Sequence, residues 1–198
     1  MLTVPAPANG ADVRSTDLRT KRDTLAVVTR RRSAQVFLTY AAVLGIARLA
    51  FGDGLGRGDV LALVATLAII GPVEWFIHKF LLHAPEDAWT SRKLGTGTGH
   101  RQHHVDPTEL DALLLSGTDA FVFINMFGVV TVSWMLPLMW IVDGALLGPF
   151  LSAWMIAALA LAHYEWVHLL VHTRYRPRTR YYARLARNHR LHHYRNEN

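Results

Sequence analysis

The stretch "AFVFINMFGVVTVSWMLPLMWIV" at positions 120–142 decides the fold, because its 23 residues carry no charge. About 20 apolar residues suffice to cross the hydrocarbon core of a bilayer, so we expect a membrane-spanning helix here. Three further apolar runs, at 33–51, 60–77 and 144–162, contain at most one charged residue each. The chain of 198 residues therefore predicts four membrane-spanning helices. Buried helices of a soluble protein are the alternative, which four such runs disfavour because they leave little amphipathic surface to meet water.

The basic residues lie at the two ends of the chain. Seven Lys and Arg precede the first apolar run and eight follow the last, whereas the connections around Asp53 and Asp143 hold only Arg57. The positive-inside rule then places both termini in the cytoplasm, as four spans allow. The net charge of +6 is explained by this topology, so we expect no nucleic-acid partner. We divide the chain into a basic cytoplasmic N-terminal segment, 1–32, and a membrane domain, 33–198.

All 11 histidines fall in four boxes, "HKFLLH" at 78–83, "HRQHH" at 100–104, "HYEWVHLLVH" at 163–172 and "HRLHH" at 189–193. The i, i+3, i+4 spacing of "HRQHH" and "HRLHH" puts three imidazoles on one side of a helix, so we expect each of these boxes to aim them at one point. The expected topology brings all four boxes to the cytoplasmic face. The sequence thus predicts an all-α, four-helix transmembrane bundle with a cytoplasmic, histidine-rich helical cap.

A histidine set of this size indicates metal binding. Neutral imidazole suits Zn, Cu, Fe and Ni, and one ion takes about four to six ligands, so ten clustered histidines exceed one ion and suit two. The sequence contains no HExxH zinc-protease pattern and no cysteine, which excludes thiolate and iron–sulfur ligation within the chain. A haem carrier needs only one or two histidines per haem, placed inside the bundle.

The spacing HxxxxH, HxxHH, HxxxH, HxxHH on a four-span protein resembles the fatty acid hydroxylase/sterol desaturase superfamily of membrane di-metal oxygenases. The resemblance runs over about residues 74–194, and "HHYRNEN" at 192–198 is similar as well. It implies a centre of two iron ions, with zinc as a substitute in overexpressed protein, and O2 as the co-substrate. It implies no catalytic side chains beyond the metal ligands, which would be His78, His83, His100, His103, His104, His168, His172, His189, His192 and His193.

Ligating imidazoles need a hydrogen-bond partner on their second nitrogen. We expect such partners among Glu74, Asp106, Glu165 and Asn188, all near the boxes. Glu74 and Glu165 are the stronger candidates, because a carboxylate at membrane depth is costly without a role, whereas an ordinary surface role is favoured for Asp106. His163 is an additional histidine, which we assign to the same supporting shell because it lies deeper in the last span.

The resemblance implies hydroxylation of a lipid C–H bond, of fatty acyl, ceramide or sterol type. The lipid would enter from the bilayer, and electrons would come from a separate donor of ferredoxin or haem-protein type. A carotenoid ring hydroxylase is the close alternative, because "VHLLVHTRYRPRTRYYARLARNHRLHH" at 167–193 also resembles that branch, and a lipid desaturase is the third hypothesis. A non-enzymatic metal-binding or metal-transporting protein is less favoured, because the runs 33–51 and 120–142 contain no histidine, aspartate or glutamate.

Overall fold

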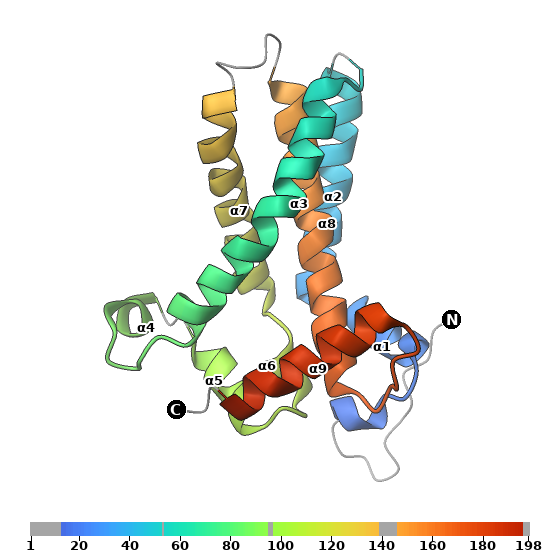
Figure 1. The fold of residues 1–198 in the computed structure, drawn as a ribbon, viewed down its shortest axis with the longest axis vertical. Coiled ribbons are helices and arrows are strands. Elements are labelled where there is room, and N and C mark those ends of the chain that lie inside the picture. Colours follow the sequence, from blue (N-terminus) through green and yellow to red (C-terminus); the bar gives the residue numbers. More distant parts are fainter. Residues whose placement is uncertain (1–12, 53, 95–96, 139–145, 196–198) are drawn as a thin grey trace. The chain divides into compact units, whose positions relative to one another are not determined.

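The computed structural model describes residues 13–52, 54–94, 97–138 and 146–195, and these residues form helices and connections without strands (Figure 1). The chain divides into two compact units. The first, which we call the histidine unit, contains Met1–Arg31, Ile77–Leu115 and Tyr164–Asn198. The second, the span unit, contains Arg32–Phe76 and Ser116–His163. The expected all-α class is confirmed for the described part of the chain.

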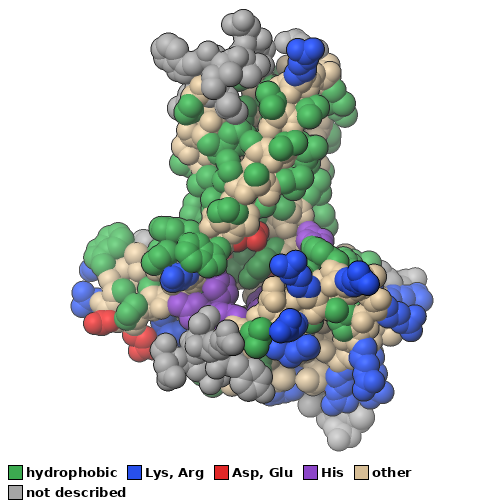
Figure 2. All heavy atoms as spheres, in the orientation of Figure 1, with side chains coloured by type: hydrophobic (Ala, Val, Ile, Leu, Met, Phe, Trp, Pro, Cys, Tyr) green, Lys and Arg blue, Asp and Glu red, His purple; other side chains and the backbone are tan. Residues whose placement is uncertain are grey.

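Four long helices supply the span unit: α2 (Arg32–Phe51), α3 (Arg57–Ile77), α7 (Gly117–Leu138) and α8 (Leu147–His172). Each is long and apolar enough to cross a membrane, which confirms the four predicted spans. Hydrophobic side chains cover the visible surface of these helices (Figure 2). Residues 139–145, which contain Asp143, the end of the third predicted run and the start of the fourth, lie outside the described residues, and so does Asp53.

Small and aromatic residues set the packing between α7 and its neighbours. On α2, the Tyr40 hydroxyl accepts a hydrogen bond of 2.8 Å from the Asn125 amide of α7. A Cβ atom added at Gly128 would lie 2.7 Å from the indole of Trp154, so this glycine lets α7 approach α8 closely. The Trp154 indole N–H donates to the carbonyl oxygen of Ile124 at 2.9 Å, which leaves no buried donor unsatisfied at this contact.

A buried ion pair links α2 and α3 within the span unit. The guanidinium of Arg48 donates from Nε to Oδ1 of Asp59 at 2.9 Å and from Nη2 to Oδ2 at 2.8 Å. The Ser152 hydroxyl of α8 donates to Asp59 Oδ1 at 2.7 Å and accepts from Arg48 Nε at 3.2 Å. The Arg48 and Asp59 side chains are only 7% and 11% exposed. The one charge in the first predicted span is therefore neutralised inside the protein.

Short helices make up most of the histidine unit. They are η1 (Ser15–Asp17), α1 (Lys21–Val28), the π-helical turn η2 (His78–Leu82), α4 (Trp89–Leu94), α5 (Thr98–Val105), α6 (Leu110–Leu113) and α9 (Arg180–Arg195). Helix α1 begins with a capping box, in which the Thr20 hydroxyl accepts from the Asp23 amide and the Asp23 carboxylate accepts from the Thr20 amide. The basic segment after Pro177 forms α9, which carries the last histidine box. Helix α8 continues as far as His172, so the whole histidine box at 163–172 lies on this helix.

Candidate metal centre

A π-helical turn presents the first histidine box. Helix α3 ends at Ile77, and the chain continues as η2, in which the His83 amide donates to the His78 carbonyl at 3.1 Å. Residues five apart point about 140° away from each other in an α-helix, whereas the wider π turn brings them closer to one side. The rings of His78 and His83 consequently lie with their centroids 5.0 Å apart.

A left-handed glycine places the second box next to the first. Gly97 precedes α5 with φ of 80°, a conformation that other residues rarely adopt. A Cβ atom there would lie 2.4 Å from the carbonyl oxygen of Leu82, so the chain can pass the end of η2 only with glycine at this position. As a result, His100 Nε2 lies 3.1 Å from His83 Nε2.

Five imidazoles converge to form what we call the first histidine group: His78, His83, His100, His104 and His192. The Nε2 atom of His192 lies 2.9 Å from that of His78 and 3.3 Å from that of His83. The Nε2 atom of His104 lies 3.0 Å from that of His192 and 3.1 Å from that of His100. Four of the five, without His104, offer nitrogens that all lie within 4.8 Å of one another.

The other five predicted ligands form the second histidine group: His103, His168, His172, His189 and His193. The Nε2 atom of His189 lies 2.6 Å from that of His172 and 3.0 Å from that of His193, and the Nε2 atoms of His168 and His103 are 3.3 Å apart. His103, His172, His189 and His193 offer nitrogens within 4.8 Å of one another. The two groups are adjacent, since the rings of His104 and His193 lie 4.3 Å apart.

Each HxxHH box is divided between the two groups, so the expectation that one box aims all its imidazoles at one point is wrong. On α5, His100 and His104 join the first group and His103 joins the second. On α9 the division is reversed, with His192 in the first group and its neighbours His189 and His193 in the second. The reason is helical geometry, because consecutive residues point about 100° apart and only the i, i+4 pair shares a direction.

The imidazoles of the first group cannot satisfy one another by hydrogen bonding. A neutral imidazole nitrogen either donates one proton or accepts one, yet His192 Nε2 lies within 3.3 Å of three other Nε2 atoms. A shared cation removes this conflict, because two nitrogens bound at ~2.1 Å and at right angles to each other are about 3 Å apart. The residues present therefore fit a metal ion in each group, and the all-nitrogen donor set suits Fe or Zn.

Burial keeps these imidazoles neutral, as metal ligation requires. It lowers the pKa of His104 to about 4 and that of His192 to about 3, with a smaller contribution from the neighbouring imidazoles. It is also the cause of the lowered pKa of His83. For His103, which is 1% exposed, burial and then the His172 imidazole lower the pKa to about 2.

The predicted supporting residues are placed as follows. Glu165 is buried, and its Oε1 accepts from the Leu115 amide at 3.1 Å. Asp106 accepts from the Thr108 hydroxyl at 2.6 Å, from the Thr108 amide at 3.0 Å and from Arg14 at 2.9 Å, contacts that lower its pKa to about 2. Asn188 is exposed on α9. The span unit contains Glu74, which is half-buried, and His163, which is exposed; neither belongs to a histidine group.

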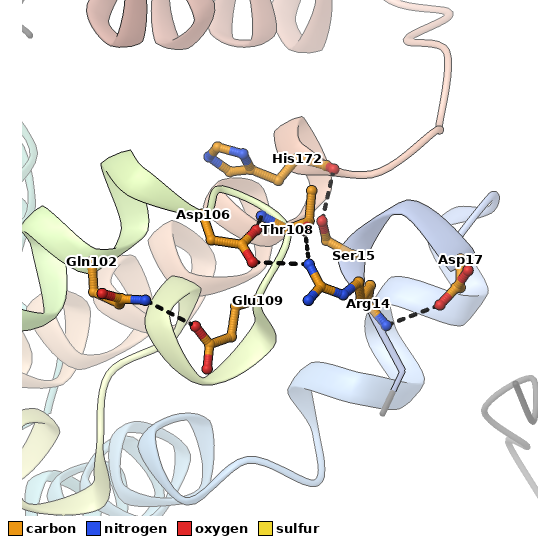
Figure 3. A network of polar contacts seen from close by, with 8 residues as sticks. All are labelled: Arg14, Ser15, Asp17, Gln102, Asp106, Thr108, Glu109 and His172. Carbon is orange, nitrogen blue, oxygen red and sulfur yellow. Dashed lines mark hydrogen bonds and ion pairs between the residues drawn. The ribbon is translucent and has the colours of Figure 1, made fainter. Parts of the chain in front are cut away.

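Residues that the sequence did not single out hold the ligand segments of the histidine unit together. The Ser15 hydroxyl donates to the carbonyl oxygen of His172 at 3.0 Å, and Arg14 donates to Asp106 and Thr108 (Figure 3). The Nδ1 atoms of His103 and His104 are buried and have no hydrogen-bond partner in the described part of the chain. The hydrogen-bond partner that we expect on the second nitrogen of a ligating imidazole is therefore absent for His103 and His104 in the described part of the chain.

Four helices able to cross a membrane and two adjacent groups of histidine nitrogens define a membrane protein with a candidate two-metal centre. The sequence model of the fatty acid hydroxylase family matches residues 63–198, which is more than half of the chain and includes all ten predicted ligands. The chain therefore belongs to the fatty acid hydroxylase family, and the resemblance to the fatty acid hydroxylase/sterol desaturase superfamily is confirmed. No curated protein and no solved structure was found to match it.

Proposed function

We propose that the protein is a membrane di-iron oxygenase that uses O2 to hydroxylate a C–H bond of a lipid of fatty acyl, ceramide or sterol type. The observation that carries the proposal is the convergence of ten imidazoles in two adjacent groups, one for each ion. Membership of the fatty acid hydroxylase family supports the reaction class. Since imidazole sites discriminate poorly between Fe and Zn, the choice of iron rests on the family rather than on the donor atoms.

The first histidine group would hold one ion and the second group the other, and bound iron would supply the redox chemistry that activates O2 towards a C–H bond. The chain's own residues prepare the centre. Burial holds His104 and His192 in the neutral form that offers a lone pair at neutral pH. His103 and His168, 1% and 9% exposed, keep bulk water away from one side of the second group. The i, i+4 pairs on α5 and α9 orient the ligands.

The apolar helices and the composition of the chain support proposals for the substrate and the partners. Four apolar helices long enough to cross a membrane support a substrate that resides in the bilayer. With all ten grouped histidines assigned as metal ligands and no cysteine in the chain, we propose that electrons come from a separate donor of ferredoxin or haem-protein type. We place both termini and the centre on the cytoplasmic side, on the strength of the Lys and Arg distribution.

Isotope labelling tests the proposed reaction. Membranes containing the iron-loaded protein, a reducing donor and candidate acyl lipids should give, under ¹⁸O2, a product that carries one labelled oxygen atom. The product should be absent with His193→Ala, because this change removes a nitrogen from the second group. A desaturated product without label would instead identify a desaturase, and a labelled carotenoid would redirect the substrate assignment. No product from metal-loaded protein with any lipid and a working donor would overturn the oxygenase.

Cysteine labelling tests the sidedness independently, because the chain has no cysteine of its own. Single cysteines at Thr98 and Thr179 should react with an impermeant reagent only after permeabilisation. Cysteines at positions 53 and 143 should react in intact cells. The opposite pattern would overturn the cytoplasmic centre.

A further inference from the structure

The N-terminal strap, which we define as residues 14–21, lies outside the region matched by the family, 63–198, yet it contacts the segments that carry the second histidine group. We propose that this strap positions the ligand-bearing segments and so sets how tightly the centre retains its metal. The inference rests on the proposed metal centre. Arg14, Ser15, Leu18 and Lys21 make the contacts that carry it, and they act as positioning residues because none of them is a ligand.

The strap first binds the segment that follows α5. The Ser15 amide donates to the Thr108 carbonyl at 3.0 Å, and Arg14 donates to Asp106 Oδ2 at 2.9 Å and to the Thr108 hydroxyl at 2.6 Å (Figure 3). Asp106 stands two residues after His104, a member of the first group. Because the Arg14 side chain is 56% exposed, its ion pair adds little stability, and the buried amide of Ser15 is the firmer attachment.

The strap next holds the end of α8. The Ser15 hydroxyl donates to the backbone carbonyl of His172 at 3.0 Å, and Ser15 is fully buried. The Leu18 carbonyl accepts from the Arg174 amide at 3.0 Å, and Leu18 is also fully buried. These bonds lie on the backbone of a predicted ligand and two residues beyond it. The last turn of α8 is thereby fixed at the position from which His172 reaches the second group.

Lys21 then links the strap to α9. Its ammonium group lies 4.0 Å from the ring centroid of Tyr182, 5.6 Å from that of Tyr175 and 5.9 Å from that of Trp166. Trp166 belongs to α8 and Tyr182 to the first turn of α9, and their rings meet edge to face with centroids 5.9 Å apart. The cation therefore joins the two helices that carry His168, His172, His189 and His193.

There is a physical reason for contacts that position the ligand-bearing segments from outside the ligand set. Neutral imidazoles can form only some of the N–H···N bonds that their spacing offers, so the metal-free groups hold η2, α5, α8 and α9 in register only weakly. Metal sites lose affinity when their ligands are displaced by more than about 0.5 Å, and contacts outside the ligand set supply the required positioning. The strap contacts three of the four ligand-bearing segments or their direct continuations.

Metal release tests the strap in the full-length, metal-loaded protein. In Ser15→Ala/Lys21→Gln, a hydrogen bond and a cation–π contact of ordinary strength are lost, so we expect metal to pass to a chromogenic chelator roughly tenfold faster than from wild type. The matched control is Thr16→Ala/Arg22→Gln, which removes one hydroxyl and one charge that make none of these contacts; it should release metal at the wild-type rate. The single variant Lys21→Arg keeps a cation at this position, so it should release metal as slowly as wild type.

A second measurement needs no metal and separates positioning from global unfolding. Amide hydrogen exchange in α9 should be faster in the metal-free double variant than in metal-free control, while exchange in α2 and α7 stays unchanged. If the double variant fails to fold, the single variants Ser15→Ala and Lys21→Gln, each expected to speed release about threefold, give the same test. Equal rates of metal release from metal-loaded wild type and from the strap variants would overturn the positioning role of the strap but not the metal centre. A wild-type protein that binds no metal would overturn the centre, and the role of the strap with it.

Discussion

Two buried polar clusters among the described residues differ in how their polar atoms are paired. In the span unit, Nε and Nη2 of Arg48 and the Ser152 hydroxyl each donate to an acceptor within 3.2 Å. In the histidine unit, the first histidine group gathers nitrogens of one kind at 2.9 to 3.3 Å, and its members cannot all donate to one another. The first arrangement is complete within the protein, whereas the second is complete only with a cation.

This difference separates a structural cluster from a functional one. Arg48 and Asp59 carry opposite charges, so their attraction offsets part of the cost of burying them and no ligand is needed. The grouped imidazoles include no acidic side chain, and burial makes protonation of His103 and His192 unfavourable, so a cation from outside the chain is the partner that suits them. Buried polar groups that cannot all hydrogen-bond to one another at once are therefore the better guide to the site, even though both clusters are buried and polar.

Removing the shared nitrogen of the first group should have the largest effect. His192 lies within 3.3 Å of three other Nε2 atoms, so His192→Ala should lower the metal content from about two ions per chain to about one and abolish turnover. Metal analysis of purified protein and the labelled-oxygen assay measure this. The matched control is His163→Ala, a change in an exposed histidine outside both groups, which should leave most of the metal bound. Full metal content in His192→Ala would contradict the assignment of this group.

Breaking the ion pair should cost stability but not metal. Asp59→Asn leaves the Arg48 guanidinium, 7% exposed, without its counter-charge, and we expect a loss of about 3 to 5 kcal/mol in the free energy of unfolding. Denaturant unfolding in detergent measures it. The double variant Arg48→Leu/Asp59→Leu should recover most of the loss, because neither charge then remains buried. A metal content that falls along with stability in Asp59→Asn would show that the two clusters are not independent.

The sequence predicts the large features and misses the contacts that depend on exact direction. Four apolar runs predict the spans, because span length and hydrophobicity are local properties, and the resemblance to the family implies which ten histidines meet. The division of each HxxHH box between two groups was missed, although the 100° step between His103 and His104 contains that signal. A π turn at His78–Leu82 was also missed, and the i, i+5 spacing of its box is the clue that an α-helix would not serve.

Long-range partners could not be predicted at all. Arg48 and Asp59 are 11 residues apart, on different helices, and Ser152 is 93 residues from Asp59. Ser15 and His172 are 157 residues apart, and nothing in the polar N-terminal segment distinguishes this serine from its neighbour Thr16. Hydrophobic patterning determines which segments are buried but not which hydroxyl meets which carbonyl, because that depends on the packed tertiary structure.

Acid should destabilise the metal-free protein through the histidine unit. The pKa of buried His103 is lowered to about 2, whereas an unfolded histidine has a pKa near 6.5, so the unfolded chain takes up protons first as the pH falls. For this residue alone, each pH unit below about 6.5 should lower the free energy of unfolding by up to ~1.4 kcal/mol, while the stability is retained above it. Thermal unfolding from pH 7.5 to 5.0 measures this. Bound metal should raise the unfolding midpoint without flattening this dependence, because ligation keeps the folded imidazoles unprotonated while the unfolded chain still takes up protons. A pH-independent metal-free protein would contradict the burial.

The smallest effect should come from the hydroxyl that completes the ion pair. Ser152 donates to Asp59 at 2.7 Å and accepts from Arg48 at 3.2 Å, but the two charged groups keep their own bidentate contact when it is lost. Ser152→Ala should therefore cost only about 1 kcal/mol in unfolding free energy, the usual net value of a hydrogen bond, with metal content unchanged. Ser133→Ala is the matched control, because this exposed hydroxyl donates only locally, to the Val130 carbonyl at 2.7 Å, and its loss should be smaller still. A cost for Ser152→Ala as large as that of Asp59→Asn would mean that the hydroxyl, rather than the pairing of opposite charges, completes the cluster.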